Sequence, residues 1–266
     1  MNKLISAGFT RLWKDKVFWI ICIIMFMYGV SLSFKTDVNV PLEGIFFGFV
    51  IMGSIPTAVF CGMFVGTEYS NGTIRNKIIV GHSRYSVYFS NLIVNAIASI
   101  LIAFSYILAL FIVGVPRLGF FQVSAEHIVF YSFAAIMMIF ALASIYTLLC
   151  LLITNKATSA VICILVSFAL ILSSTKIKSQ LEEIKSHESN INTSTAVEQL
   201  DISQDNLTIT KQDLYQLLYD LVPTCQGMQI AMQTSDGTWR LPVYSAGIII
   251  INSGLGIFLF KRKDLK

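Results

Sequence analysis

The chain has 266 residues, of which 55% are apolar and 13% are charged, and its mean hydropathy is +0.73. Because roughly a quarter of the residues in soluble domains are charged, this composition excludes an ordinary soluble domain and predicts a surface that largely faces lipid. The net charge of +4 does not indicate nucleic-acid binding, since the basic residues stand at the ends of apolar runs.

The first segment, residues 1–16, has the pattern of an amphipathic helix. Leu4, Phe9 and Leu12 fall near one helical face, and the basic residues of the segment fall largely elsewhere. We expect this helix to lie in the membrane interface, with Trp13 at the depth of the lipid headgroups.

Six apolar runs have close to the roughly 20 residues that a helix needs to cross a hydrocarbon core about 30 Å thick. They are residues 17–34, 44–66, 87–115, 127–153, 157–172 and 243–260. None contains Asp, Glu, Lys or Arg, which fits a membrane span because a charge at the bilayer centre costs at least about 2.5 kcal/mol. We predict an all-α polytopic membrane protein with five spans in residues 17–174, and a sixth, followed by a basic tail, in 243–266.

The charges between the runs divide unequally between the two sides of the membrane. The side that holds both termini carries twelve basic and three acidic residues, and the other side carries seven basic and twelve acidic residues. By the positive-inside rule, both termini are expected in the cytoplasm. The long segment 175–242 is then an extracellular loop before the last span.

Two patterns inside the runs predict how the spans pack. Gly62 and Gly66 have the spacing that lets two helix backbones approach closely in lipid. Asn91, Asn95 and Ser99 recur every four residues and place three polar groups on one helical face, where each needs a protein partner. Two interpretations of this polar face stay open, namely contact between helices and one wall of a translocation path.

The loop of residues 67–84, between the second and third runs, predicts a short helix. Asn71 and Gly72 form a turn signal, Thr73 is the expected cap of the helix, and Gly81 is expected to end it in a left-handed conformation.

Between these signals lies an apolar ridge of Ile74, Ile78 and Ile79, beside Arg75 and Lys77. We therefore expect a short amphipathic helix at the membrane surface. A role limited to anchoring two spans, with the basic residues on anionic lipid headgroups, is the alternative.

In order, the loop holds an acidic residue, a Gly-Thr pair, a basic residue, a glycine and a Ser-Arg pair. This pattern, with six spans, resembles the permease subunits of type-2 ATP-binding cassette (ABC) exporters. The resemblance implies that the short helix is a coupling helix that docks on a nucleotide-binding subunit. The residues assigned to this coupling are Glu68, Gly72, Thr73, Ile74, Arg75, Ile78, Gly81 and Arg84.

The chain has no P-loop, because the motif GxxxxGK[ST] needs a Gly-Lys pair and the sequence contains none. The resemblance implies that a separate ABC ATPase subunit binds ATP and Mg, while this chain binds no cofactor or metal and is not itself an enzyme. It also implies a second permease copy or a sister permease as partner, together with membrane lipids. The expected location is the plasma membrane of a bacterium.

Segment 175–242 is polar and acidic, with short amphipathic helices expected in its second half. Residues 190–210 are rich in Ser, Thr and Asn, and part of this stretch is expected to be mobile. Four leucines at helical spacing precede Pro223 and predict a helix that ends near Val222, followed by a short helix at residues 226–232. The leucines are Leu214, Leu217, Leu218 and Leu221.

In the resembled family, short helices in this position help to close the exit. The leucine stripe is therefore an expected outer gate, with a plain packing role as the alternative. The extra residues before Asp213 are expected to form a lid or a site for an external partner.

Two classes of function follow. The first is export of an amphipathic or hydrophobic substrate, such as a peptide antibiotic, a lipid or a drug. The lack of charge inside the runs favours it over an ion-coupled carrier. The second is a membrane sensor or scaffold whose outer loop binds a ligand or partner.

Overall fold

The computed structural model describes residues 1–37, 40–193, 202–233 and 239–263, and these residues are helical with short connections. The helices, in chain order, are α1 (Asn2–Lys14), α2 (Lys16–Lys35), α3 (Glu43–Phe46), α4 (Gly48–Met52), α5 (Ser54–Ser70), α6 (Thr73–Ile79), α7 (Arg84–Ala109), the π-helical turn η1 (Leu110–Gly114), α8 (Val115–Leu118), α9 (Ala125–Leu152), α10 (Lys156–Thr193), α11 (Ile202–Leu221), α12 (Pro223–Met232) and α13 (Arg240–Arg262).

Among the described residues, six helical segments are long and apolar enough to cross a membrane. They are Lys16–Lys35, Glu43–Ser70, Arg84–Leu118, Ala125–Leu152, Lys156–Ile184 and Arg240–Arg262. The prediction of an all-helical chain with six candidate spans is confirmed: five segments contain one apolar run each, and Ala125–Leu152 covers the run 127–153 except its last residue.

The second span is broken into α3, α4 and α5. Pro56 lies in the first turn of α5 and cannot donate a backbone hydrogen bond to the preceding turn. The helix is interrupted at Gly53, just before this proline, and the Gly53 amide bonds to the Phe49 carbonyl at 2.7 Å. A proline at this position accounts for the interruption.

The bundle is built around α5, α7 and α9, which pack against one another. The α2 helix packs on α7, α10 packs on α5, and α13 packs on α9. Four tyrosines are fully buried between these helices, and one of them, Tyr106, donates to the Ile45 carbonyl at 2.6 Å. The amphipathic α1 turns its Leu4 and Leu12 inward against the bundle, next to α7.

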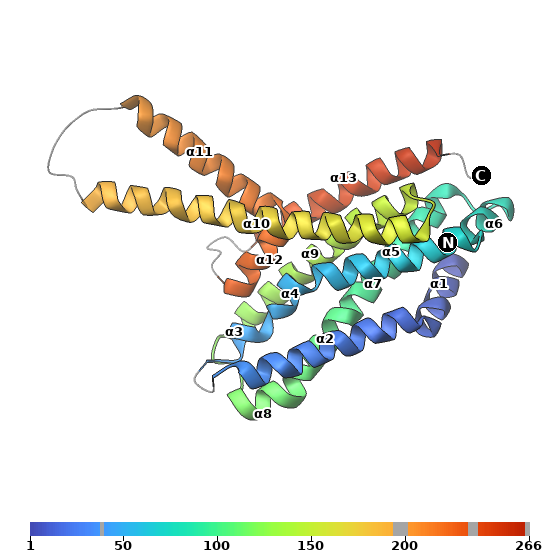
Figure 1. Ribbon diagram of the computed structural model, residues 1–266, viewed down its shortest axis with the longest axis horizontal. Helices are drawn as coiled ribbons and strands as arrows, with labels where there is room; N and C mark the ends of the chain where they lie inside the picture. Colours follow the sequence, from blue (N-terminus) through green and yellow to red (C-terminus); the bar gives the residue numbers. More distant parts are fainter. Residues whose placement is uncertain (38–39, 194–201, 234–238, 264–266) are drawn as a thin grey trace.

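The two ends of the bundle differ. One end, called the terminal end here, carries α1, α6 and the last turn of α13 (Figure 1). At the opposite end α10 and α11 form a helical hairpin that projects beyond the bundle (Figure 1), and we call this the hairpin end. Leu181 and Tyr219 pack in the small core of this hairpin together with Cys225 of α12.

The hairpin differs from the expected loop with short helices in its second half, because the first part of segment 175–242 is helical as well. The fifth run ends at Leu172, but α10 continues as one helix to Thr193. The physical reason is that polar residues end a membrane span without ending a helix, and Lys178 and Glu182 support the extension as an i,i+4 pair at 3.5 Å. Residues 194–201 of the stretch expected to be mobile lie outside the described residues. The predicted helices before and after Pro223 are confirmed as α11 and α12.

The close packing of α5 on α10 gives a first test. A Cβ atom added at Gly62 would lie 2.6 Å from Ala160 Cα, which is a backbone atom with little freedom to move. We expect Gly62→Ala to destabilise the purified protein by about 1–3 kcal/mol, the usual cost of overpacking. Thermal unfolding in detergent measures the effect.

The matched control is Gly254→Ala in α13, where an added Cβ has no neighbour within 4 Å. This control should leave stability unchanged or slightly raised, because alanine is the better helix former. Equal melting temperatures for the two variants would contradict the α5–α10 packing.

Candidate functional site

The α6 helix lies at the terminal end and is held between two left-handed glycines. Gly72 (φ 64°) precedes the helix, and Gly81 (φ 98°) follows it, where the His82 amide donates to the Lys77 carbonyl at 3.1 Å. The left-handed ending at Gly81 is therefore confirmed. The capping role of Thr73 is wrong, because Thr73 is the first helical residue and Gly72 occupies the cap without a side-chain hydrogen bond.

The isoleucines of α6 do not share one face. Ile74 is buried, with 1% of its surface exposed, and Ile78 is half-buried against the core. Ile79 and Val80 are 70% and 78% exposed, and Arg75 is also exposed. The expected ridge is thus divided, and direct docking of a partner on Ile74 is excluded in this structure because Ile74 is covered by its own chain.

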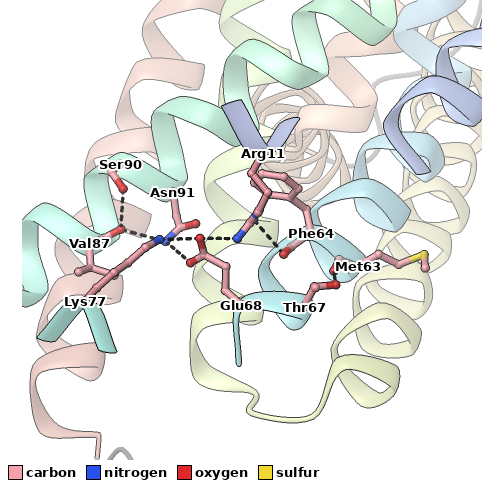
Figure 2. A network of polar contacts seen from close by, with 9 residues as sticks. All are labelled: Arg11, Met63, Phe64, Thr67, Glu68, Lys77, Val87, Ser90 and Asn91. Carbon is pink, nitrogen blue, oxygen red and sulfur yellow. Dashed lines mark hydrogen bonds and ion pairs between the residues drawn. The ribbon is translucent and has the colours of Figure 1, made fainter. Parts of the chain in front are cut away.

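Glu68, in the last turn of α5, joins α6 to three other helices. Its side chain is 3% exposed, and its Oε1 atom lies 2.5 Å from Arg11 Nη1 of α1 and 2.5 Å from Lys77 Nζ of α6. The other oxygen, Oε2, accepts a hydrogen bond from Asn91 Nδ2 of α7 at 3.3 Å. Figure 2 shows this network, in which one carboxylate contacts side chains of α1, α6 and α7.

The electrostatics of the network follow from burial. Arg11 also donates to the Phe64 carbonyl at 3.1 Å and lies 3.6 Å over the Phe64 ring (Figure 2). Loss of water lowers the pKa of the Arg11 guanidinium, and the Glu68 carboxylate opposes this change. A carboxylate as buried as Glu68 is costly without partners, so removing one partner of such a group is strongly destabilising.

Sequence reasoning selected Glu68 but missed Arg11 and Lys77 as its partners. The sequence did contain a sign that Glu68 is paired, because acidic residues are scarce near it. Glu68 is one of three acidic residues in the segments predicted on the same side of the membrane as both termini, which carry twelve basic residues. A carboxylate among so many basic side chains is expected to form an ion pair with one of them.

The polar face of α7 contacts two neighbouring helices, α5 and α9. Asn91 contacts Glu68, Asn95 Nδ2 donates to Thr147 Oγ1 of α9 at 2.8 Å, and Ser99 donates to the Asn95 carbonyl at 2.7 Å. A cavity beside Ser99 has a volume of about 10 Å³, which is room for about one water molecule. In this structure Asn91 and Asn95 thus contact neighbouring helices, whereas Ser99 bonds within α7.

Arg84, which the family pattern assigns to coupling, binds the end of the last span. Its Nη1 atom donates to the carbonyls of Phe260, Lys261 and Lys263 at 2.7, 3.0 and 2.6 Å. A cation in this position satisfies the free carbonyls at the end of α13 and complements the helix dipole. Arg84 thus fastens the start of α7 to the end of α13.

A second cation extends this connection to α5. Lys263 Nζ donates to the Leu151 carbonyl of α9 at 2.9 Å and to the Tyr69 hydroxyl of α5 at 3.1 Å. Burial lowers the pKa of the Lys263 ammonium to about 8. Tyr69 itself donates to the Leu151 carbonyl, so α5, α9 and the end of α13 meet beside Glu68.

The leucines expected to form an outer gate lie on the exposed side of α11. Leu214, Leu217 and Leu221 are 55%, 49% and 41% exposed, and Leu218 is half-buried. The side of α11 that packs on α10 is the one that carries Tyr219. The leucines therefore do not close the bundle within one chain.

The α12 helix, not the leucine stripe, fills the hairpin end of the bundle. It packs against α4, α9 and α10. Gln226 accepts a hydrogen bond from Ser245 of α13 at 2.6 Å, and Gln229 donates to Asp220 Oδ1 at 3.0 Å. Sequence reasoning missed these two buried amides, since a glutamine in a short polar segment carries no sign of burial.

Comparisons with known proteins assign no family, because neither the models of protein families nor the curated proteins gave a match. Within the described residues no group of three or more His, Cys, Asp or Glu side chains is placed to hold a metal ion. The geometry at the terminal end therefore carries the functional argument.

The network around Glu68 gives the second test. We expect Glu68→Gln to remove the carboxylate that pairs with Lys77 and Arg11 and to increase amide hydrogen exchange in α6 about 10- to 100-fold. This range corresponds to about 1.4 to 2.8 kcal/mol, which is below the full cost of breaking a buried ion pair because Arg11 is partly exposed. Hydrogen exchange followed by mass spectrometry measures the change.

Two single variants separate the arms of the network: Lys77→Gln should loosen α6, and Arg11→Gln should loosen α1. The control is Glu126→Gln, which removes an exposed carboxylate in the first turn of α9 and should leave α6 unchanged. Normal protection of α6 in Glu68→Gln would show that Glu68 does not hold this helix.

Proposed function

We propose that this protein is the membrane-spanning permease subunit of an ATP-driven exporter of the type-2 ABC class, with α6 as the docking site of a separate ATPase. The observation that carries the proposal is the division of α6 into two faces. The inner face is attached to the bundle through Ile74 and Lys77. The outer face presents Arg75 and Ile79, and Val80, which directly follows the helix, is exposed beside them.

A docking helix transmits force only if it is attached firmly to the helices that must move. Here Lys77 attaches α6 to Glu68 of α5, and the same carboxylate contacts α1 and α7. A displacement of α6 by a partner would therefore act on the second and third spans together. This arrangement supports a coupling role better than an anchoring role, which would not need a shared buried carboxylate.

The outer face of α6 also suits a protein partner. Two neighbouring apolar side chains that are at least 70% exposed, with Arg75 near them, resemble the centre of a small protein interface. We propose that this end of the molecule is cytoplasmic, in agreement with its excess of basic residues. ATP and Mg would then be bound entirely by the partner.

We propose that the substrate passes between two permease copies, or between this chain and a sister permease. The cavity next to the polar face of α7 is about 10 Å³, which is far too small for a peptide, a lipid or a drug. The substrate class, an amphipathic or hydrophobic molecule moved outward across a bacterial plasma membrane, remains part of the proposal.

The α10–α11 hairpin supports the second candidate, a sensor or scaffold. It is a projecting element with a small core of its own and exposed leucines, as a binding surface for an external partner would be (Figure 1). The two candidates differ in what binds the terminal end, because only the exporter needs an ATPase on α6.

The third test uses the exposed face of α6. We expect the tagged protein, purified from its native membrane, to bring with it an ATPase that contains a P-loop. The double variant Ile79→Asp/Val80→Asp should reduce this association at least tenfold, because two charges replace the apolar contact. Quantitative mass spectrometry of the purified complex measures the ratio of the two proteins.

The matched control is Leu214→Asp/Leu217→Asp, which makes the same chemical change on exposed leucines at the hairpin end. It should leave the ATPase bound. Absence of any P-loop ATPase from the wild-type preparation would refute the exporter proposal. Retention of the ATPase by the α6 variant would refute the docking site alone.

A further inference from the structure

A cavity of about 320 Å³ opens at the terminal end, where α1 turns into α2 and where α5 ends and α10 begins. Four basic side chains and one acidic one line it, together with Thr67 of α5. These charged residues are Arg11, Lys14, Asp15, Lys16 and Lys156. None of the coupling or gating roles described above uses this cavity.

The cavity has an excess of positive charge that the described residues do not neutralise. Arg11 is paired with Glu68, and the Asp15 carboxylate caps α2 by accepting from the Val17 amide at 2.8 Å. Lys14, Lys16 and Lys156 form no ion pair within the described part of the chain. The Asp15 carboxylate keeps its negative charge, but three ammonium groups outnumber it, so the cavity favours an anionic ligand.

The position of the cavity relative to the spans identifies the kind of anion. Lys16 and Lys156 are the first residues of two membrane-spanning helices. Trp13 and Trp19, 53% and 46% exposed, lie close by, and the Trp19 ring nitrogen donates to the Trp13 carbonyl at 3.0 Å. Exposed tryptophans at the ends of spans are typical of the headgroup layer, so the cavity faces this layer.

An adjoining cavity provides space for the rest of a lipid. It has a volume of about 700 Å³ and shares Met63 and Lys156 with the basic cavity. Its other lining residues are polar where the chain enters α10, namely Ser70, Thr154 and Asn155, and small on the first turns of the α10 span, namely Ala157 and Ala160. The polar group of a bound lipid would thus have basic neighbours, and its apolar part would continue along α10.

We propose that the basic cavity binds the phosphate headgroup of an anionic phospholipid, with Lys14, Lys16 and Lys156 as its ligands. The bound phosphate joins the α1–α2 turn to the start of α10. Since Arg11 lines the same cavity and pairs with Glu68, the lipid also stabilises the helix that supports the Glu68 network. This proposal does not depend on the exporter assignment.

The test measures binding and thermal stability of the full chain in detergent. Phosphatidylglycerol should raise the melting temperature of the wild type in a saturable way, whereas phosphatidylcholine should not. In the variant Lys14→Gln/Lys16→Gln/Lys156→Gln the apparent affinity for phosphatidylglycerol should fall at least tenfold. The rise in melting temperature that phosphatidylglycerol causes in the wild type should also become smaller as salt is added.

The control variant Lys35→Gln/Lys176→Gln/Lys261→Gln removes the same charge from exposed lysines that do not line the cavity, and it should keep the wild-type affinity. An equal loss of affinity for phosphatidylglycerol in both variants would overturn the proposal, because general surface charge would then explain binding. If the triple cavity variant does not fold, the single variant Lys156→Gln tests the proposal instead. Its apparent affinity for phosphatidylglycerol is expected to fall at least threefold.

Inorganic phosphate alone distinguishes a lipid from a free anion. Millimolar phosphate should not reproduce the stabilisation, because it lacks the contacts along α10. If phosphate alone gives the full effect and competes with phosphatidylglycerol, the site takes a free anion and the lipid proposal is overturned.

Discussion

The terminal end of this protein depends on a single buried carboxylate. Glu68 is nearly inaccessible to water and stands at the end of a span, where an unpaired charge is costly. Arg11, Lys77 and Asn91 supply its hydrogen bonds from three different helices. Because all three are needed around one group, the amphipathic α1 and the short α6 are fixed relative to α5 and α7, and neither is an independent surface element.

This constraint separates the residues of α6 that hold the helix on the bundle from those that are exposed. A helix of seven residues between two left-handed glycines has little stability alone, so its order comes from the contacts of Ile74 and Lys77 with the bundle. Once these two positions face inward, helical geometry places Arg75 and Ile79 outward. The coupling pattern therefore contains both structural and exposed residues, and only the exposed ones are available to a partner.

Much of the fold was predictable because apolar runs without charge leave few alternatives to membrane helices. Gly72 and Gly81 likewise marked α6, since their conformations cost other residues more. The pairing of Arg11 with Glu68 was not predictable, because it joins distant segments and depends on how α1 packs. The orientation of Ile79 was equally hidden, since three isoleucines in one short helix do not show which side the bundle covers.

The same packing gives the terminal end a physical connection to the hairpin end through α13. Arg84 and Lys263 bind the last turn of α13 to α7, α9 and the Tyr69 turn beside Glu68. Toward the other end of α13, Ser245 donates to Gln226 of α12, which fills the bundle there. Hydrogen bonds near both ends of α13 therefore connect the Tyr69 turn beside Glu68 with α12 at the hairpin end.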